Sequence, residues 1–129
     1  MEMVVLGSVT LPGVARSVGG ARRFAVDVLD GDARAGTAEL LISEACTNSV
    51  RHSRSRSGGM ITLTLYDAAG TLRCEVVDEG AATVPTARRD EGAREHGYGV
   101  LLIESLADRC GHFNGDRGRL HVWFELDKG

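Results

Sequence analysis

The segment that decides the fold reads ELLISEACTNSVRH and runs from Glu39 to His52. Apolar residues recur along it at helical spacing, and Glu44, Asn48 and His52 follow one another at intervals of four. Residues four apart lie on one side of a helix, so these polar groups form a line along it. A carboxylate one turn from a carboxamide suits a base beside a metal ligand. The alternative is an ordinary solvated helix face, because polar pairs at this spacing are common.

The composition is typical of a soluble globular protein. The chain has 129 residues, of which 43% are hydrophobic and 26% charged, and this fits one domain, residues 1–129, with one core. No apolar run reaches the length of a membrane span, and the start of the chain lacks a secretory signal, so we expect a cytoplasmic protein without a membrane partner. The formal net charge of −3 gives no electrostatic reason to expect direct binding of nucleic acid.

The cysteines and histidines do not predict a metal centre. Cys46, Cys74 and Cys110 are widely spaced in apolar surroundings, and no CxxC pair exists. This spacing disfavours zinc. We expect buried free thiols in a reducing compartment. The histidines also lack metal-binding spacing.

The rest of the pattern predicts strands and helices in groups. We expect strands at 3–10, 60–66 and 71–77, helices at 14–29, 33–52 and 98–110, and a final hairpin of 112–114 with 119–126. A short turn at 67–70 makes the two middle strands antiparallel. The order favours an α+β fold, a two-layer α/β sandwich with a mixed, mostly antiparallel sheet covered on one face by helices.

A second motif, VVDEGAA, runs from Val76 to Ala82. Asp78 follows an apolar strand and can present a carboxylate to an exocyclic amine, such as the N6 amine of adenine. Gly80 would let a ligand lie close to the backbone. The alternative is a simple strand-ending turn, which Asp-x-Gly also suits.

A third motif, Gly97-Tyr98-Gly99, opens the last predicted helix. Backbone N–H groups at the positive end of a helix bind anions. The motif is neither a Walker A loop nor a dinucleotide fingerprint, because it lacks the Gly-Lys-Ser/Thr sequence and a parallel βαβ unit. A plain helix-entry loop is the alternative. The charged run at 88–96 either screens a triphosphate or is simply a solvated loop.

In this order the three motifs resemble the N, G1 and G2 boxes of the histidine kinase-like ATPases, the GHKL superfamily. The segments at 40–52, 97–111 and 122–126 look like those of small stand-alone ATP-binding proteins of actinobacterial type, related to anti-sigma factor serine kinases. The segment at 11–24 is similar to their N-terminal part. The resemblance therefore covers nearly the whole chain, and it is more specific for the fold and the nucleotide site than for the reaction.

The resemblance implies ATP and Mg²⁺ as ligands. Asn48 would coordinate the Mg²⁺ that bridges the phosphates, and Glu44 would activate a protein hydroxyl or a water molecule. Asp78 would bind the adenine amine, with Gly80 beside the base.

At the start of the last helix, Gly97 and Gly99 would cradle the phosphates. Two departures from the family pattern bear on nucleotide affinity. Ala82 replaces the usual second glycine of the G1 box, and His121 stands where these relatives often have a threonine near the adenine.

For function, the resemblance implies an anti-sigma factor-type protein serine/threonine kinase that regulates transcription. It would phosphorylate an anti-sigma factor antagonist protein with Mg-ATP and bind a sigma factor as its alternative partner. A non-catalytic ATP-binding partner-switching regulator and an ATP hydrolase remain open, although Glu44 favours catalysis. Related anti-sigma kinases dimerise, so a homodimer is compatible with the resemblance.

Overall fold

The computed structural model describes residues 2–52, 59–79 and 97–128. Five strands form one sheet in the order β1-β2-β3-β5-β4, and every pairing among them is antiparallel. The strands are β1 (Met3–Pro12), β2 (Met60–Ala68), β3 (Thr71–Asp78), β4 (Arg109–Asn114) and β5 (Leu120–Leu126). A single 3₁₀ turn, η2 (Asp116–Gly118), connects β4 to β5.

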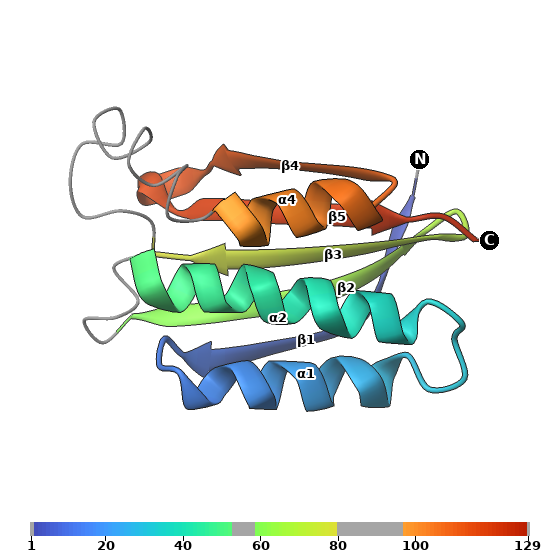
Figure 1. The fold of residues 1–129 in the computed structure, drawn as a ribbon, viewed down its shortest axis with the longest axis horizontal. Coiled ribbons are helices and arrows are strands. Elements are labelled where there is room, and N and C mark those ends of the chain that lie inside the picture. Colours follow the sequence, from blue (N-terminus) through green and yellow to red (C-terminus); the bar gives the residue numbers. More distant parts are fainter. Residues whose placement is uncertain (1, 53–58, 80–96, 129) are drawn as a thin grey trace.

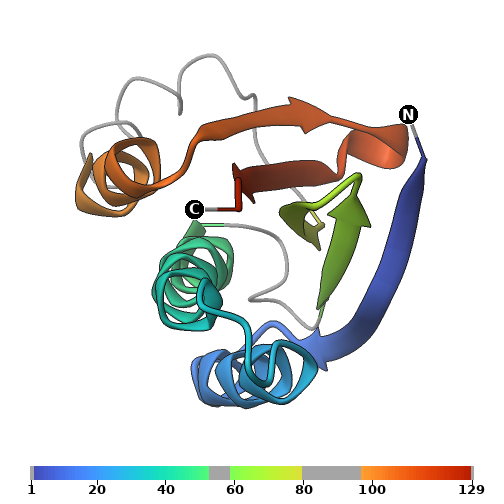
Figure 2. The ribbon, with the colours of Figure 1, turned by 90° about the vertical axis from the view of Figure 1, so that its right-hand side faces the viewer.

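Within the described residues, three helices cover one face of this sheet. They are α1 (Arg16–Val28), α2 (Ala35–His52) and α4 (Gly97–Leu106), and α2 lies between the other two (Figures 1 and 2). The predicted two-layer α+β sandwich is confirmed, with a described sheet that is wholly antiparallel rather than mixed. We call the face toward the helices the helix-side face and the opposite one the outer face.

The helix-side face carries the core. Buried residues alternate with half-buried ones along most of β2 and along β3. The largest fully buried apolar side chains are Leu41, Ile42, Ile61, Leu65, Leu72, Val76 and Phe124. Complete burial of a side chain of this size contributes roughly 1.5–3 kcal/mol to folding. On α1, the small buried residues Ala21 and Ala25 face the core.

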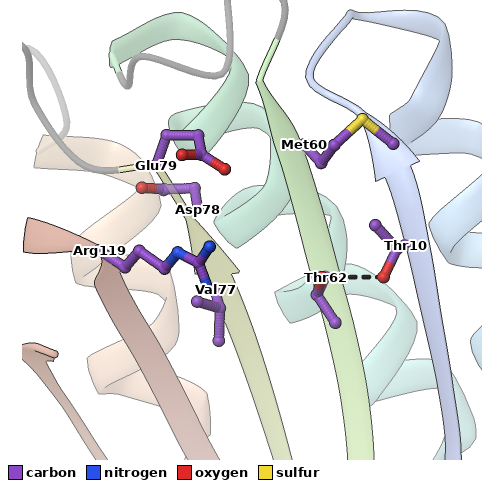
Figure 3. Close-up of a pocket in the computed structure, with 7 residues that line it drawn as sticks. All are labelled: Thr10, Met60, Thr62, Val77, Asp78, Glu79 and Arg119. Carbon is purple, nitrogen blue, oxygen red and sulfur yellow. Dashed lines mark hydrogen bonds between the residues drawn. The ribbon is translucent and has the colours of Figure 1, made fainter. Parts of the chain in front are cut away.

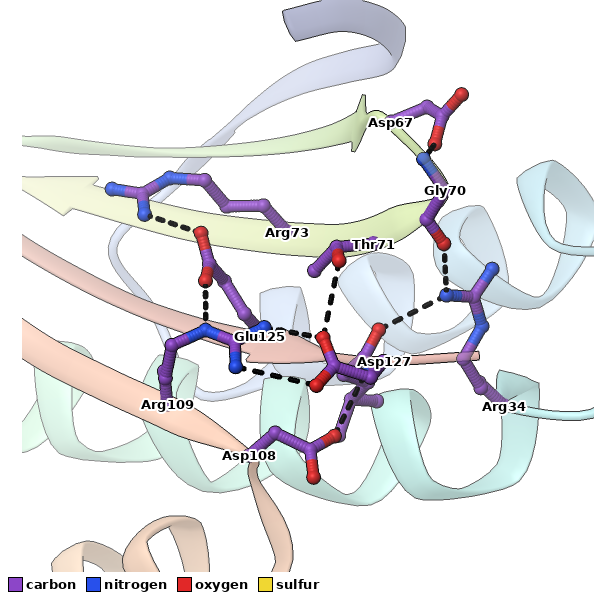
Figure 4. A network of polar contacts seen from close by, with 10 residues as sticks. Arg34, Asp67, Gly70, Thr71, Arg73, Asp108, Arg109, Glu125 and Asp127 are labelled. Atoms are coloured by element: carbon purple, nitrogen blue, oxygen red, sulfur yellow. Dashed lines mark hydrogen bonds and ion pairs between the residues drawn. The ribbon is translucent and has the colours of Figure 1, made fainter. Parts of the chain in front are cut away.

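The half-buried side chain of Arg34 anchors the start of α2. The Arg34 guanidinium donates a hydrogen bond to the carbonyl oxygen of Gly70 at 3.0 Å (Figure 4). It also donates to the carbonyl oxygen of Leu126 at 3.0 Å and to the Asp32 carboxylate. The Asp32 side chain also accepts the backbone N–H of Arg34 at 2.8 Å, which closes a turn just before the first residue of α2. These hydrogen bonds from Arg34 lower the pKa of Asp32 to about 2. The contacts tie α2 to the β2–β3 turn and to the end of β5.

One predicted boundary was wrong. The last helix ends at Leu106 rather than at residue 110, and Arg109 and Cys110 instead begin β4. Arg109 forms ion pairs with Glu125 and Asp127 across and beyond the adjacent strand (Figure 4). Non-local pairing with β5 therefore overrides the helical period of the local sequence.

Candidate nucleotide site

Asp78 is the final residue of β3 and lies opposite Leu120 of β5. Its side chain is only 1% exposed. Along β3 the buried positions are Leu72, Cys74, Val76 and Asp78, while the residues between them are half-buried. Because side chains alternate along a strand, Asp78 belongs to the helix-side face. The apolar strand thus delivers a buried carboxylate to the end of the sheet, beneath the helix layer.

Cys46 of α2 lies close enough to Asp78 for the charge of this carboxylate to affect its thiol. The thiol is fully buried, and burial together with the negative charge of Asp78 raises its pKa to about 12. The charge of Asp78 therefore acts on the second half of α2. Cys46, Cys74 and Cys110 are all free, but only Cys46 and Cys74 are buried as predicted, and Cys110 is half-buried. Burial also raises the pKa of the Cys74 thiol.

Glu44 and Asn48 lie on the flank of α2 turned away from α1. Glu39 of α2 accepts hydrogen bonds from Arg22 of α1, which identifies the flank facing α1. At 3.6 residues per turn, Glu44 and Asn48 lie about 140° and 180° around the helix from Glu39. Both are half-buried. Since α2 lies between α1 and α4, these two polar side chains line the side next to α4 (Figure 1).

The glycine motif forms the first turn of α4. Gly97 is the first residue of the helix and Gly99 lies within its first turn, so both are helical rather than part of a preceding loop. The first N–H groups of a helix have no acceptor within it and are available to an anion. The start of α4, the end of β3 and the C-terminal end of α2 lie at the same end of the molecule (Figure 1). Three motifs that are distant in sequence are thereby brought together.

Some predicted features fall outside the described residues. These are Gly80, Ala82 and the charged run at 88–96.

His121 lies on the opposite side of the sheet from Asp78. It pairs with Val77, its ring stacks on Phe113 with the centroids 4.4 Å apart, and its Nδ1 lies 3.5 Å from the Glu75 carboxylate. All these groups are on the outer face. The register of β5 on β3 therefore turns the His121 side chain away from Asp78, to the other face of the sheet.

A small cavity opens at the same end of the sheet as Asp78. Its volume is about 200 Å³. Seven residues line it, namely Thr10, Met60, Thr62, Val77, Asp78, Glu79 and Arg119 (Figure 3). The hydroxyl groups of Thr10 and Thr62 are hydrogen-bonded at 2.9 Å. Thr10, Thr62 and Val77 point to the outer face, so the cavity lies largely across the sheet from Glu44 and Asn48. Sequence reasoning missed Arg119, which carries no motif.

The described residues fit a magnesium nucleotide better than a protein-only metal centre. Among residues 2–52, 59–79 and 97–128, no three His, Cys, Asp or Glu side chains gather as a metal site. Mg²⁺ bound with a nucleotide needs few protein ligands, because phosphates and waters supply the other oxygens. An oxygen of this kind is present in the half-buried carboxamide of Asn48. In the described part of the chain, no helix has the length and apolar character needed to cross a membrane.

Comparison with known proteins identifies the class. Residues 11–125 match the family model of the histidine kinase-like ATPase domain, and the chain belongs to this family. The general activity of this class is ATP-dependent kinase or ATPase chemistry.

A solved structure supports the fold. The histidine kinase domain from the Erythrobacter litoralis EL346 blue-light activated histidine kinase is similar, with a TM-score of 0.57 and 20% sequence identity. The similarity covers 88% of this chain and 60% of that one, so this chain spans only part of that domain's length. No curated protein gives a match.

Proposed function

We propose that the protein is an anti-sigma factor-type serine/threonine kinase that uses Mg-ATP. Its substrate is an anti-sigma factor antagonist protein, and a sigma factor is its alternative partner. The observation that carries the proposal is the position of Glu44 and Asn48 on the flank of α2 turned away from α1. The C-terminal end of this helix lies at the same end of the molecule as the end of β3 and the first turn of α4 (Figure 1). Membership of the histidine kinase-like ATPase family supports ATP as the phosphoryl donor.

Asp78 fits the recognition of the adenine base. A buried carboxylate is a strong hydrogen-bond acceptor, and its interaction with an amine is strengthened where water is excluded. The side chain is 1% exposed, so an amine hydrogen bond made there is shielded from solvent. The N–H groups at the start of α4 would hold phosphate oxygens at the positive end of the helix.

Asn48 and Glu44 divide the phosphoryl chemistry between them. The Asn48 carboxamide oxygen would bind Mg²⁺, which when present neutralises charge on the phosphates. One turn earlier, Glu44 would take the proton of a partner's serine or threonine hydroxyl while that oxygen bonds to the γ-phosphorus. The bond from the γ-phosphorus to the β–γ bridging oxygen breaks and ADP leaves. Positioning and charge stabilisation do most of the work in such transfers.

A transfer assay tests the proposal. The protein is incubated with γ-labelled ATP, Mg²⁺ and candidate antagonist proteins from the same genome, with Glu44→Gln as the test variant. Glu39→Gln is the matched control, because it removes a carboxylate from the same helix on the opposite flank. Label transfer that is lost in Glu44→Gln and kept in Glu39→Gln supports the kinase.

The other outcomes separate the alternatives. Release of phosphate without label transfer would contradict the kinase proposal and support an ATP hydrolase. ATP binding with neither label transfer nor phosphate release would contradict both enzymes and support a non-catalytic partner-switching regulator. Failure to bind ATP would contradict all three.

A further inference from the structure

Strand β4 forms the edge of the described sheet opposite β1 (Figure 1). Among the described strands it pairs only with β5. Its six residues read RCGHFN, include no proline, and have about the average length of a strand. Arg109 is its only Lys, Arg, Asp or Glu residue, and it already forms ion pairs with Glu125 and Asp127. Natural edges are usually protected by charge or by proline, so β4 beyond Arg109 is open to pairing with a further strand.

The hydrogen bonds at the two ends of β4 show which of its backbone groups point to the free edge. The carbonyl oxygens of Glu125 and Arg119 accept the N–H groups of Asp108 and Gly115, at 2.9 Å and 2.8 Å. Backbone groups of every second residue point the same way along a strand, so the odd-numbered residues of β5 face β4. The residues of β4 opposite them are also odd-numbered. The backbone groups that point to the free edge therefore belong to the even-numbered residues, which are Cys110, His112 and Asn114.

Two aromatic rings line the outer face of this edge. Trp123 pairs with Gly111, and its indole fills the space of the missing side chain, since a Cβ on Gly111 would lie 2.9 Å from Cζ2. The ring therefore extends from β5 across β4. Two residues further along β4, Phe113 stacks on His121 and is still 45% exposed. On an added strand, an apolar side chain opposite Gly111 would meet the indole, and one opposite Phe113 would cover its ring.

The helix-side face of the same edge is polar. His112 and Asn114 belong to this face, because they pair with Val122 and Leu120 of β5, and both are exposed. A strand that fits both faces of the edge must therefore alternate apolar and polar side chains. It should also carry no strong charge, because the guanidinium of Arg109 is already matched by two carboxylates.

We propose that the β4 edge binds an extended, uncharged segment of a partner protein, which joins the sheet as a further strand. An extended backbone satisfies the alternating N–H and C=O groups of an edge, a mode of recognition called β-augmentation. The segment runs antiparallel to β4, as every pair in the described sheet does. Directly opposed residues of such a pair share a face. Apolar residues of the segment therefore lie opposite Gly111 and Phe113, and a polar residue lies opposite His112. The binding does not require ATP.

Titration with a synthetic peptide tests the proposal. The probe alternates valine and threonine between terminal lysines that keep it soluble, and the control peptide has the same composition with its valines in one block. Trp123 is the only tryptophan of the chain and lies against β4, so its fluorescence detects binding at this edge. A peptide bound along β1 would lie roughly 20 Å away. We expect a saturable change in fluorescence with the alternating peptide, and an affinity at least about tenfold lower for the block peptide.

His112→Pro tests the backbone pairing. Proline removes the N–H that points to the free edge and leaves the groups that bond to β5, so affinity for the alternating peptide should fall at least about tenfold. His112→Ala is the matched control, because it loses the same side chain and keeps that N–H. It should bind the peptide as the unmodified chain does.

N-methylated peptides make the same test on the unmodified chain, so the result does not depend on the folding of His112→Pro. The antiparallel register turns the N–H groups of the threonines toward β4 and those of the valines away from it. Methylation of the threonine nitrogens should therefore abolish binding, and methylation of the valine nitrogens should not.

Three results would overturn the proposal. They are an unchanged Trp123 fluorescence with the alternating peptide, equal affinity for the block peptide, and equal affinity of His112→Pro and His112→Ala. A fluorescence change that depends on the concentration of the chain alone would mean that a second copy occupies the edge, and this too would overturn the proposal. Loss of binding on methylation of the valines rather than the threonines would overturn the antiparallel register.

Discussion

The Asp78 carboxylate at the end of β3 raises the pKa of the Cys46 thiol on α2, adding to the larger effect of burial. The two residues come from separate segments of the sequence, and the end of β3 therefore lies near the second half of α2. The same coupling has a consequence for stability at alkaline pH.

Cys46 should make unfolding easier as the pH rises above 9. The ordinary thiol pKa is 9.0, and in the folded chain it is raised to about 12. Below pH 9 the thiol is protonated in both states, so it has no effect. Between these values only the unfolded thiol loses its proton, and the free energy of unfolding falls by up to about 1.4 kcal/mol per pH unit. Denaturant unfolding at a series of alkaline pH values should show a shallower decline for Cys46→Ala, and identical slopes would contradict this.

Arg34 should be important for stability. Arg34→Met leaves the carbonyl oxygens of Gly70 and Leu126 without this donor and removes the partner of Asp32. We expect a loss of about 2–3 kcal/mol in the free energy of unfolding. Arg22→Met is the control, because its ion pair with Glu39 is more exposed and should contribute less than about 1 kcal/mol. Equal losses in the free energy of unfolding for the two variants would show that the contacts of Arg34 stabilise the fold no more than an exposed ion pair does.

The stability contributed by the contact between Asp32 and Arg34 should depend on pH in the acid range. Hydrogen bonds from Arg34 lower its folded pKa from 3.8 to about 2. This contribution is therefore fully present above about pH 4 and is lost as the pH falls through 2. Unfolding curves for the unmodified chain and Arg34→Met should converge as the pH is lowered across this range. A gap that stays constant would count against the assigned cause.

Gly111 should be sensitive to the smallest enlargement. A Cβ at this position would lie 2.9 Å from Cζ2 of Trp123, so the indole ring must shift. The guanidinium group of Arg73 stacks over the same ring, with its carbon 4.2 Å from the ring centroid. Gly111→Ala should therefore cost about 1–3 kcal/mol and change the fluorescence of the single tryptophan. Gly36→Ala in α2 meets nothing within 4 Å and should be neutral or slightly stabilising.

Asn48 should be needed for magnesium but less so for the fold. Asn48→Ala removes a half-buried carboxamide from the flank of α2 and should abolish the Mg²⁺ dependence of ATP binding. Calorimetric titration with ATP, with and without Mg²⁺, measures this directly. Unchanged Mg²⁺-dependent affinity would mean that Asn48 has only a structural role.

The sequence predicted those parts of the structure that local patterns control. Alternating apolar and polar residues marked β2, and the apolar run before Asp78 placed its carboxylate at a strand end. The line of Glu44 and Asn48 followed from helical spacing alone. These features depend on residues that are neighbours in sequence, so periodicity is sufficient.

Other features depend on contacts between distant segments. The last helix ends at Leu106 because the residues from Arg109 onward pair with β5 as strand β4. The side of the sheet on which His121 lies is set by the register of β5 on β3, and the exposed edge at Leu6 by a bulge against β2. None of these has a local signature, because strand register is fixed by pairing partners.

The central claim is that Asp78 lies at the base of an ATP site, and calorimetric titration of Asp78→Asn with Mg-ATP tests it most directly. The substitution keeps the shape of the buried side chain and removes its charge, so affinity should fall at least about tenfold. His121→Ala, on the outer face, should bind as the unmodified chain does. Equal affinities for Asp78→Asn and the unmodified chain, or no binding of Mg-ATP by the unmodified chain, would contradict the account.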